Sequence, residues 1–352
     1  MTTMKVESDK NQENFYLSPI DRRQFLTGGL FFLGSGLLLP RWLKSNMGSG
    51  CTPASPKALV AIVQSDKVRI ARNRLNAKVI QKLLDKGLQG LFPGKSITSI
   101  WRELFKPGDV VAVKLNCIAG KGLSPNKELV QAIVTGLRSA GVKNNNIILF
   151  DRMDQDLRRA GYEISTRRGQ IRCVGNDHIG YSRNLLIHKS IGSVVSRIVT
   201  EYATAIINVP VLKDHGIVGI SIGMKNFFGV IHNPNKYHIN AGDPYVADLC
   251  SHPWIRDKLR LTICDALTAQ FEGGPPYMPQ WAWPFNGLLI SQDMVAIDYV
   301  GWQIIEEKRQ QAGLKSLREV GREPKYILTA ADKDHHLGVA DPRLIEVKRL
   351  TI

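Results

Sequence analysis

The segment Pro107-Gly108-Asp109-Val110-Val111-Ala112-Val113-Lys114-Leu115-Asn116 begins the most clearly patterned part of the chain. A turn leads into a continuous apolar run, which is typical of a strand covered on both faces. Apolar residues then recur at helical spacing from Leu129 to Leu137, and a second apolar run occupies residues 147–150. A strand, a helix and a strand in this order predict a right-handed crossover between parallel strands.

The same alternation of strands and helices extends in both directions along the chain. Further strands are predicted at residues 57–63, 171–174, 205–209, 261–264 and 288–290, and further helices near residues 79–84, 194–202 and 295–304. This order predicts an α/β fold with a mostly parallel sheet and helices on both faces. Residues 55–352 are expected to form a single α/β domain, preceded by an export signal and linker at residues 1–54.

The composition is that of a globular, strongly basic protein. The 352 residues are 43% hydrophobic and 22% charged, and the formal net charge is +16. A chain of this kind buries a substantial core. Lysines and arginines are scattered and form no long basic tract with interleaved aromatic residues, so no nucleic-acid partner is expected. An anionic small molecule is the partner that the charge favours.

The N-terminus resembles a twin-arginine export signal. Asp21-Arg22-Arg23-Gln24-Phe25-Leu26 precedes an apolar, glycine-interrupted run at residues 28–39, which is too short to span a bilayer reliably. This order predicts export by the twin-arginine machinery to the periplasm or the extracellular space, with no stable transmembrane anchor in the mature chain. An amphipathic helix is the alternative. Lipid attachment at Cys51 is a minority interpretation, because the cleavage box before it is incomplete.

Four cysteines follow Cys51, and no Cys-x-x-Cys pair occurs. They are Cys117, Cys173, Cys250 and Cys264. An even number permits disulfides in an exported protein, in three connectivities, but buried free thiols are favoured. The spacing gives no support for a cysteine-ligated zinc ion or iron–sulfur cluster.

Polar and ionisable residues stand where five of the predicted strands end. They are Lys114 and Asn116, Asp151, Lys213 to His215, Asp265, and Asp293. The carboxyl ends of parallel strands share one edge of a sheet, where open α/β folds bind their ligands, so a site is expected there. For Asp151 and Asp293 taken singly, capping of the following helix is the favoured interpretation.

The segment 208–238 is the strongest candidate for the site. Lys213 and His215 follow an apolar strand, and a glycine-rich stretch then leads to Lys225 and Asn226. Glycines weaken a helix by about 1 kcal/mol each relative to alanine, which is expected where backbones or ligands approach closely. A desolvated Lys225 would have a lowered pKa and act as a nucleophile or base; the alternative is a surface lysine on an amphipathic helix.

Histidines and acidic residues complete the candidate set. His215 is a candidate for proton transfer, and His238 is a candidate metal ligand. Asp265 ends a predicted strand, and Glu272 lies in the glycine- and proline-rich loop after it. Glu272 faces either the same crevice or solvent.

Several short motifs together resemble the family known as domain of unknown function 362. They are Val113-Lys114-Leu115-Asn116, Asn208-Val209-Pro210-Val211-Leu212-Lys213-Asp214-His215, Met224-Lys225-Asn226-Phe227-Phe228-Gly229, Cys264-Asp265-Ala266, Glu272-Gly273-Gly274-Pro275 and Asp293-Met294-Val295-Ala296-Ile297-Asp298. The resemblance covers most of the chain after the signal. Many relatives also carry ferredoxin-type cysteine clusters, which this sequence lacks, so no iron–sulfur cluster is expected.

A more distant resemblance, to nickel-dependent lactate racemases, concerns His215 and Lys225. Those enzymes have a histidine, a glycine-rich stretch and, at the same interval, the lysine that anchors a nickel-pincer nucleotide. The resemblance implies a proton-transfer role for His215 and a cofactor-anchoring role for Lys225, with a metal or a nickel-pincer-like nucleotide as the cofactor. The second catalytic histidine of the racemases has no counterpart on an earlier loop, since no histidine precedes His178.

The sequence therefore predicts an exported enzyme, an isomerase or an oxidoreductase, that binds an anionic or metal-containing substrate or cofactor. The candidate catalytic residues are His215, Asp265 and Glu272, the candidate ligand-binding residues are Lys114, Asn116, Lys213, Lys225 and Asn226, and the candidate metal ligand is His238. The alternative is a non-catalytic periplasmic protein that binds an anion or a metal.

Overall fold

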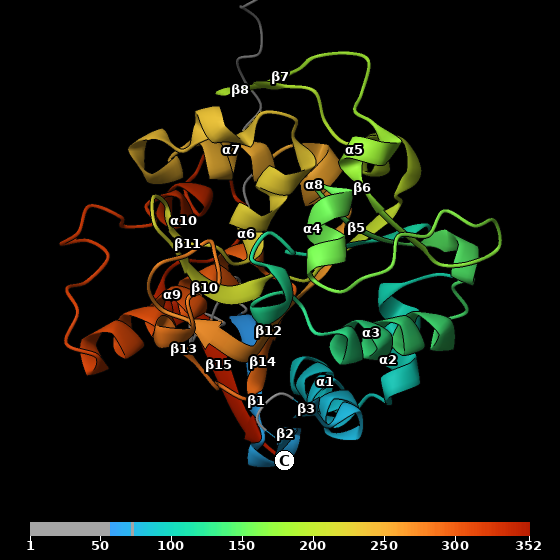
Figure 1. Ribbon diagram of the computed structural model, residues 1–352, viewed down its shortest axis with the longest axis horizontal. Helices are drawn as coiled ribbons and strands as arrows, with labels where there is room; N and C mark the ends of the chain where they lie inside the picture. Colours follow the sequence, from blue (N-terminus) through green and yellow to red (C-terminus); the bar gives the residue numbers. More distant parts are fainter. Residues whose placement is uncertain (1–56, 72–73) are drawn as a thin grey trace, which may run out of the picture. The chain divides into compact units, whose positions relative to one another are not determined.

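A central, mostly parallel sheet organises the chain. The computed structural model describes residues 57–71 and 74–352. Across the sheet the strands follow the order β15 (Ile345–Thr351), β1 (Ala58–Gln64), β14 (Gly287–Ser291), β12 (Leu259–Gln270), β9 (Ala205–Asn208), β4 (Val111–Lys114), β5 (Ile147–Asp151) and β6 (Arg172–Gly175) (Figure 1). Beside this row, β10 (Val211–His215) pairs with β12 and with β11 (Gly219–Ile220), and β13 (Ala282–Trp283) pairs with β12.

Strand directions confirm the predicted α/β class and add one correction. The strands β12, β9, β4, β5 and β6 run parallel to one another, as do β1 and β15. In contrast, β14 runs antiparallel to both β1 and β12. The end of β14, and with it Asp293, therefore lies at the opposite edge of the sheet from the ends of β4 and β5. The expectation that Asp293 shares their edge was wrong, whereas its predicted role as the cap of the next helix is confirmed by bonds from Val295 N and Ala296 N, both 2.8 Å.

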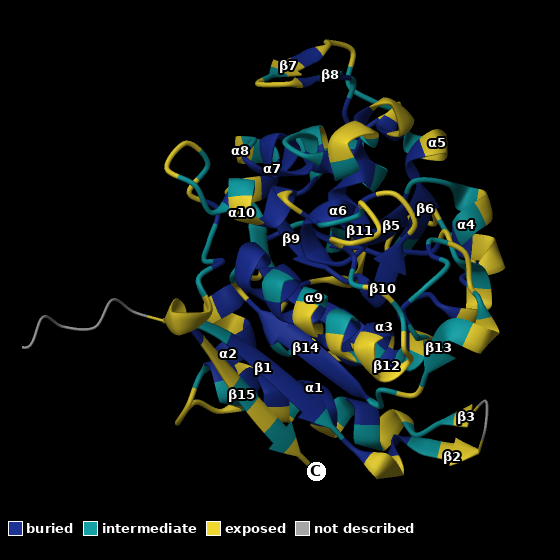
Figure 2. Ribbon diagram, turned by 90° about the vertical axis from the view of Figure 1, so that its left-hand side faces the viewer, coloured by how far each residue is buried: buried dark blue, intermediate teal, exposed yellow. Residues whose placement is uncertain are grey.

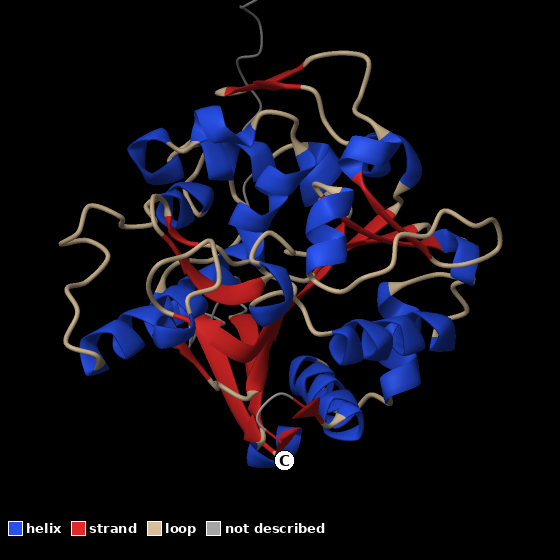
Figure 3. Cartoon of the chain, in the orientation of Figure 1, coloured by secondary structure: helices blue, strands red, loops and turns tan. Residues whose placement is uncertain are grey.

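Helices cover both faces of the sheet (Figure 3). On one face α1 (Ala77–Leu91), α2 (Ile97–Leu104) and α3 (Lys127–Ser139) pack together, and on the other lie α9 (Met294–Gln311), α6 (Gly223–Asn226), α7 (Tyr245–Cys250) and α10 (Tyr326–Ala330). Alternate residues of β1 belong to different apolar cores, Val60 and Ile62 to one and Ala61 and Val63 to the other. This period of two is what a strand covered on both faces requires, and Figure 2 shows the buried strands between the layers.

Shorter elements complete the described chain. They are α4 (Asp154–Arg159), α5 (Asn176–Ile179), α8 (Pro253–Arg256) and the hairpins β2 (Arg69–Ala71) with β3 (Arg74–Leu75) and β7 (Leu186–His188) with β8 (Ile191–Ser193). Close packing of α3 on α2 depends on Gly136, where an added Cβ would lie 2.1 Å from Cε2 of Trp101. All described residues belong to one compact unit.

One predicted strand is confirmed and one predicted helix is shorter in the structure. The apolar run expected to form a strand at residues 205–209 is β9, and after Val209 and Pro210 a separate strand, β10, carries Lys213 to His215. Proline has no N–H to donate to a ladder, but the Pro210 carbonyl still accepts from Asp265 N (2.9 Å). As a result β9 pairs with the first part of β12 and β10 with its last part. The helix expected near residues 194–202 is reduced to a single turn, Ile198–Tyr202.

The described residues bear on two further expectations. Cys117, Cys173, Cys250 and Cys264 are buried free thiols, as favoured from the sequence. Within residues 57–71 and 74–352, the helices lack the length and hydrophobicity needed to cross a bilayer. The export signal at Arg22 and Arg23, and Cys51, lie outside the described residues.

Candidate functional site

A buried network of polar side chains joins the ends of β4 and β5 to β10 and α6. Lys114 Nζ donates to Asp151 Oδ1 (2.7 Å) and to Asn226 Oδ1 (3.0 Å). Asn116 Nδ2 donates to the same Asn226 oxygen (3.1 Å), and Asn116 Oδ1 accepts from Lys213 Nζ (2.8 Å). The structure thus brings together four of the predicted ligand-binding residues around one carboxylate.

Asp151 is that carboxylate, and it does not cap α4 as the sequence favoured. Its Oδ1 accepts from Lys114 Nζ, and its Oδ2 accepts from Cys117 N (2.5 Å). The N-cap position of α4 is instead occupied by Met153, which provides no side-chain cap. Asp151 lies at the end of β5, directly beside β4, and its carboxylate is therefore within reach of Lys114.

Asp298 in α9 holds the short helix α6 in place at these strand ends. Its carboxylate accepts from the N–H groups of Gly223 (2.6 Å) and Met224 (3.0 Å), and burial raises the pKa of Asp298 to about 7. Asn208 donates to Gly223 O and accepts from Asn226 Nδ2, both at 2.7 Å. A Cβ at Gly223 would lie 2.7 Å from Asp298 Oδ1, so this close approach needs glycine.

Lys225 is a buried lysine without a counter-charge of its own. Only 7% of the residue is exposed, and its Nζ lies 4.1 Å from the ring centroid of Phe228. None of the hydrogen bonds within the described residues is donated by this amine, and its Nζ atom keeps a small contact with solvent. Burial, together with the charges of Lys213 and Lys114, lowers the pKa of Lys225 to about 7. The alternative of a surface lysine is therefore wrong, and the amine is partly neutral at neutral pH.

Burial also acts on Lys213. Its side chain is fully buried, and desolvation lowers the pKa of Lys213 to about 8 although Asp151 opposes the shift. Two neighbouring amines therefore change charge near neutral pH, which is the property that a proton-transfer or anion-binding site uses.

His215 and His238 form a stacked pair beside Lys225. Their ring centroids are 5.3 Å apart and their planes differ by 30°, and Phe228 packs edge-on against His238 at 5.5 Å. Burial, with the charges of Lys225 and His238, lowers the pKa of His215 to about 2, and burial lowers the pKa of His238. Both rings are therefore neutral at neutral pH.

Hydrogen bonds assign opposite tautomers to the two rings. His215 Nδ1 accepts from Ile217 N (3.2 Å) and Val218 N (3.4 Å), so the ring proton of His215 is on Nε2. His238 Nδ1 instead donates to Pro234 O (3.1 Å), because a carbonyl oxygen only accepts. His215 Nε2 is consequently a donor and His238 Nε2 a proton acceptor.

The structure does not bring Asp265 into this cluster. Its Oδ2 accepts from Asn126 N (2.7 Å) and Asn126 Nδ2 (2.9 Å) at the start of α3, and its Oδ1 accepts from Leu267 N (3.0 Å). Burial raises the pKa of Asp265. Each oxygen already has a partner, Asn126 at the N-cap of α3 or Leu267 within β12.

Glu272 belongs to a second network. It pairs with Arg322 (2.7 Å) and with Arg309, and Arg322 also approaches Asp214 Oδ2 at 3.5 Å. The neighbouring arginines hold the pKa of Glu272 below its usual range despite burial. This carboxylate is therefore neutralised within the fold.

His238 was the candidate metal ligand named from the sequence. Among the residues that the structure describes, no group of three or more histidine, cysteine, aspartate or glutamate side chains is placed to hold a metal ion. The free Nε2 of His238 remains the coordinating atom that such a role would use.

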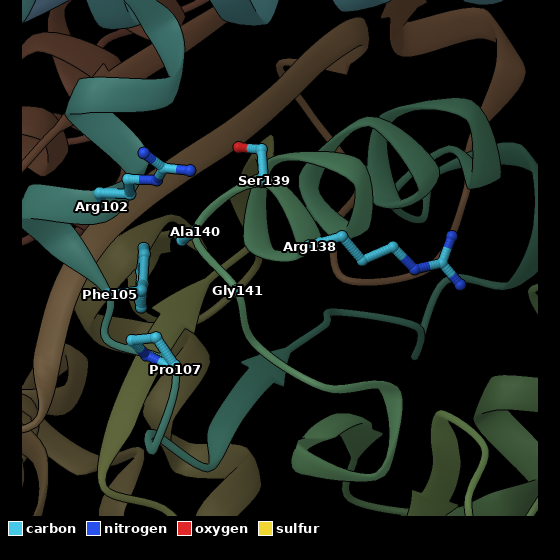
Figure 4. Close-up of a pocket in the computed structure, with 7 residues that line it drawn as sticks. All are labelled: Arg102, Phe105, Pro107, Arg138, Ser139, Ala140 and Gly141. Carbon is cyan, nitrogen blue, oxygen red and sulfur yellow. The ribbon is translucent and has the colours of Figure 1, made fainter.

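A hollow of about 450 Å³ lies elsewhere. It is lined by Arg102, Phe105, Pro107, Arg138, Ser139, Ala140 and Gly141 (Figure 4). Pro107 precedes β4 and Gly141 precedes β5, so the hollow is at the amino ends of the parallel strands. It is therefore separate from the lysines and histidines at their carboxyl ends.

Sequence reasoning missed Asp298 and Asn208 as parts of the site. Both residues hold α6 in place. This role depends on the folded chain, which brings α9 and β9 beside α6. A buried aspartate within the mostly apolar first half of α9 was the signal that would have singled out Asp298.

Comparison with known proteins finds two similar solved structures and one family match. No curated protein matches the chain. Among solved structures, the lactate racemase apoprotein from Thermoanaerobacterium thermosaccharolyticum is similar with a TM-score of 0.41 and 10% identity, over 70% of this chain and 57% of that one. A protein from Thermotoga maritima is similar with a TM-score of 0.38 and 12% identity, over 69% and 61%. This chain thus spans about three fifths of the length of those proteins.

The family match itself covers more than half of the chain. It extends over residues 111–303 and is described as "Domain of unknown function (DUF362)". This range contains β4, β5, β9, β10 and α6, and with them the whole lysine and histidine cluster. The chain therefore belongs to the DUF362 family.

Proposed function

We propose that the protein is an enzyme that binds a small organic anion through Lys213 and Lys225, close to the charge of Lys114, whose three N–H donors are already bonded to Asp151, Asn226 and Leu115 O. The observation that carries the proposal is an excess of buried positive charge: the charges of Lys114 and Lys213 act on Lys225, and among the described residues Asp151 is the carboxylate that pairs with any of them. Burying an unpaired charge is unfavourable by several kcal/mol. A bound carboxylate or phosphate would offset this cost.

The reaction that these groups suit is proton transfer at a carbon next to a carbonyl or carboxylate group. The neutral amine of Lys225 takes the proton from carbon and becomes an ammonium group, while the electron pair moves to the oxygen as an enolate. His215 Nε2–H donates a hydrogen bond to that oxygen, and His238 Nε2 is a further proton acceptor. Return of the proton to the opposite face of that carbon, or to a neighbouring carbon, completes an isomerisation without any further reactant, whereas return to the same face regenerates the substrate.

Exchange of substrate hydrogen with solvent tests this step. Small carboxylates with a C–H group next to the carboxyl carbon are incubated with the protein in D2O and followed by NMR. Deuterium incorporation at that carbon is expected with the wild type and not with Lys225→Ala. An anion that binds without any exchange across such a panel would favour the non-catalytic binding protein instead.

The alternative to a diffusible anionic substrate is a resident cofactor that carries the anionic group. The racemase resemblance points to a nucleotide held at Lys225, and the amine without a protein partner is a suitable attachment point for one. Native mass spectrometry and elemental analysis of protein purified from its own exported fraction decide between a resident cofactor and a diffusible substrate.

Anion affinity is expected to fall as pH rises. Lys225 and Lys213, with pKa values of about 7 and about 8, lose their charge through this range, and each lost proton weakens binding by up to about tenfold per pH unit. The rate of proton abstraction per bound substrate should rise over the same range, because the neutral amine is the base. Calorimetric dissociation constants and exchange rates from pH 6 to 9 measure the two trends, and an affinity that does not change with pH contradicts the lysine site.

Export by the twin-arginine route to the periplasm or extracellular space is part of the proposal, supported by the motif at residues 21–26. Arg22→Lys combined with Arg23→Lys is expected to retain the protein in the cytoplasm, because lysine lacks the planar guanidinium group. Cell fractionation measures the result. Arg41→Lys, outside the motif, is the matched control and should leave export unchanged; normal export of the double variant would remove the assigned route.

A further inference from the structure

Four large apolar side chains are exposed on segments that adjoin one another and that follow strands or residues of the lysine and histidine cluster. They are Ile118 (53% exposed), Ile217 (53%), Ile239 (64%) and Tyr277 (37%). Each is close in sequence to a component of the site or its edge: Ile118 follows Asn116 by two residues, Ile217 follows His215 by two, and Ile239 directly follows His238. Tyr277 lies in the loop after β12.

Contacts show that these loops adjoin one another. Gly216 N donates to Gly274 O (2.8 Å), which joins the loop of Ile217 to that of Tyr277. The ring of Tyr277 lies so close to Gly122 that a Cβ there would be 2.1 Å from its Cδ1, which joins it to the loop of Ile118.

The fourth loop is joined through Val218. A Cβ on Gly242 would lie 3.0 Å from Val218 Cγ1, so the loop that carries Ile239 packs against the residue after Ile217. We define the exposed side chains Ile118, Ile217, Ile239 and Tyr277 as the apolar rim.

The lysines suit an anionic group of a ligand, and the apolar rim suits an apolar part of the same ligand. Single exposed apolar residues are ordinary on a protein surface, but here they stand on adjoining loops that also carry or border His215, His238 and Asn116. The amine of Lys225 and the donor Nε2–H of His215 suit an anionic head group. The exposed apolar side chains on the segments that carry or border these residues suit a hydrocarbon body.

We infer that the ligand is an amphiphilic carboxylate, with its carboxylate on the lysines and its aliphatic chain against the apolar rim. The inference rests on the proposed function and deepens it by naming the substrate class. Burial of each methylene group on the rim tightens binding, and a bulky polar ligand gains nothing from the same surface.

The test is a series of straight-chain carboxylates, from acetate through butyrate and hexanoate to octanoate, titrated calorimetrically into the protein. Affinity is expected to rise about two- to fourfold per added methylene group until the chain passes the rim. In Ile217→Ser and Ile239→Ser this dependence should flatten, while acetate binds as it does to the wild type. Ile70→Ser, which changes an exposed isoleucine on β2, is the matched control and should keep the wild-type series.

Each other outcome has a distinct meaning. If acetate and octanoate bind equally well to the wild type, the anion site stands and the amphiphilic ligand is overturned. If no carboxylate of the series binds, the proposed function fails as well. If the protein binds phosphatidylglycerol vesicles through the rim and no soluble carboxylate, the rim contacts a membrane surface and the inference is overturned.

Discussion

Replacing Lys225 with alanine is expected to abolish hydrogen exchange and to weaken anion binding by at least about thirtyfold. Loss of a buried charged partner weakens binding by about 2–5 kcal/mol. The amine of Lys225 packs on the Phe228 ring and donates no hydrogen bond within the described residues, so it is available to the ligand. The fold should survive, because the variant also removes repulsion from Lys213 and Lys114. Calorimetry and the NMR exchange assay measure the two effects.

Two further variants separate charge from proton transfer. Lys225→Arg keeps a positive charge but its guanidinium group does not lose a proton near neutral pH, so anion binding should be partly retained while exchange is lost. Lys82→Ala removes an exposed lysine on α1 and controls for the change in net charge. Wild-type affinity and exchange in Lys225→Ala would contradict the proposed role.

Local patterns were sufficient to predict the unit that organises the sheet. Continuous apolar runs and helical spacing gave β4, α3 and β5, and the structure places them at Val111–Lys114, Lys127–Ser139 and Ile147–Asp151. Such patterns report which faces of an element are covered, which is a property of neighbouring residues. They do not report strand direction, so the antiparallel β14 and the true edge of Asp293 were not predictable.

Part of the site could also be predicted, for a geometric reason. Parallel strands bring their carboxyl ends to one edge, and this rule alone placed Lys114, Asn116 and Lys213 together. The residues assigned incorrectly had a plausible local role. Asp151 precedes a helix and was interpreted as its cap, whereas its partner Lys114 is 37 residues away.

The acidic candidates illustrate the same difference between local and distant information. Asp265 and Glu272 lie near the predicted edge, but their oxygens are occupied by Asn126 and by Arg309 and Arg322. No pattern in the sequence joins Glu272 to arginines of α9 and of the loop after it. The tautomers of His215 and His238 likewise depend on backbone groups that only the folded chain places beside the rings.

The largest loss of stability is expected from Asp151→Ala. Lys114 Nζ and Asp151 Oδ1 are 2.7 Å apart with both side chains buried, and the variant leaves Lys114 unpaired beside two other lysines. It also removes the acceptor of Cys117 N. Breaking a buried ion pair by removing one partner lowers the free energy of unfolding by about 3–5 kcal/mol, which denaturant titration at neutral pH measures directly.

A second substitution shows whether the unpaired charge causes this loss. Lys114→Met in the Asp151→Ala background removes the buried ammonium group while keeping a long side chain, so much of the lost stability should return. The free-energy changes of the single and double variants form a cycle, and a favourable coupling between them is expected because the two atoms touch. Two outcomes would contradict this interpretation: Asp151→Ala unfolds at the wild-type denaturant concentration, or the free-energy changes of the two substitutions are additive. In either case the charge of Lys114 is not neutralised by Asp151. The excess charge on which the anion site depends must then be neutralised by another group.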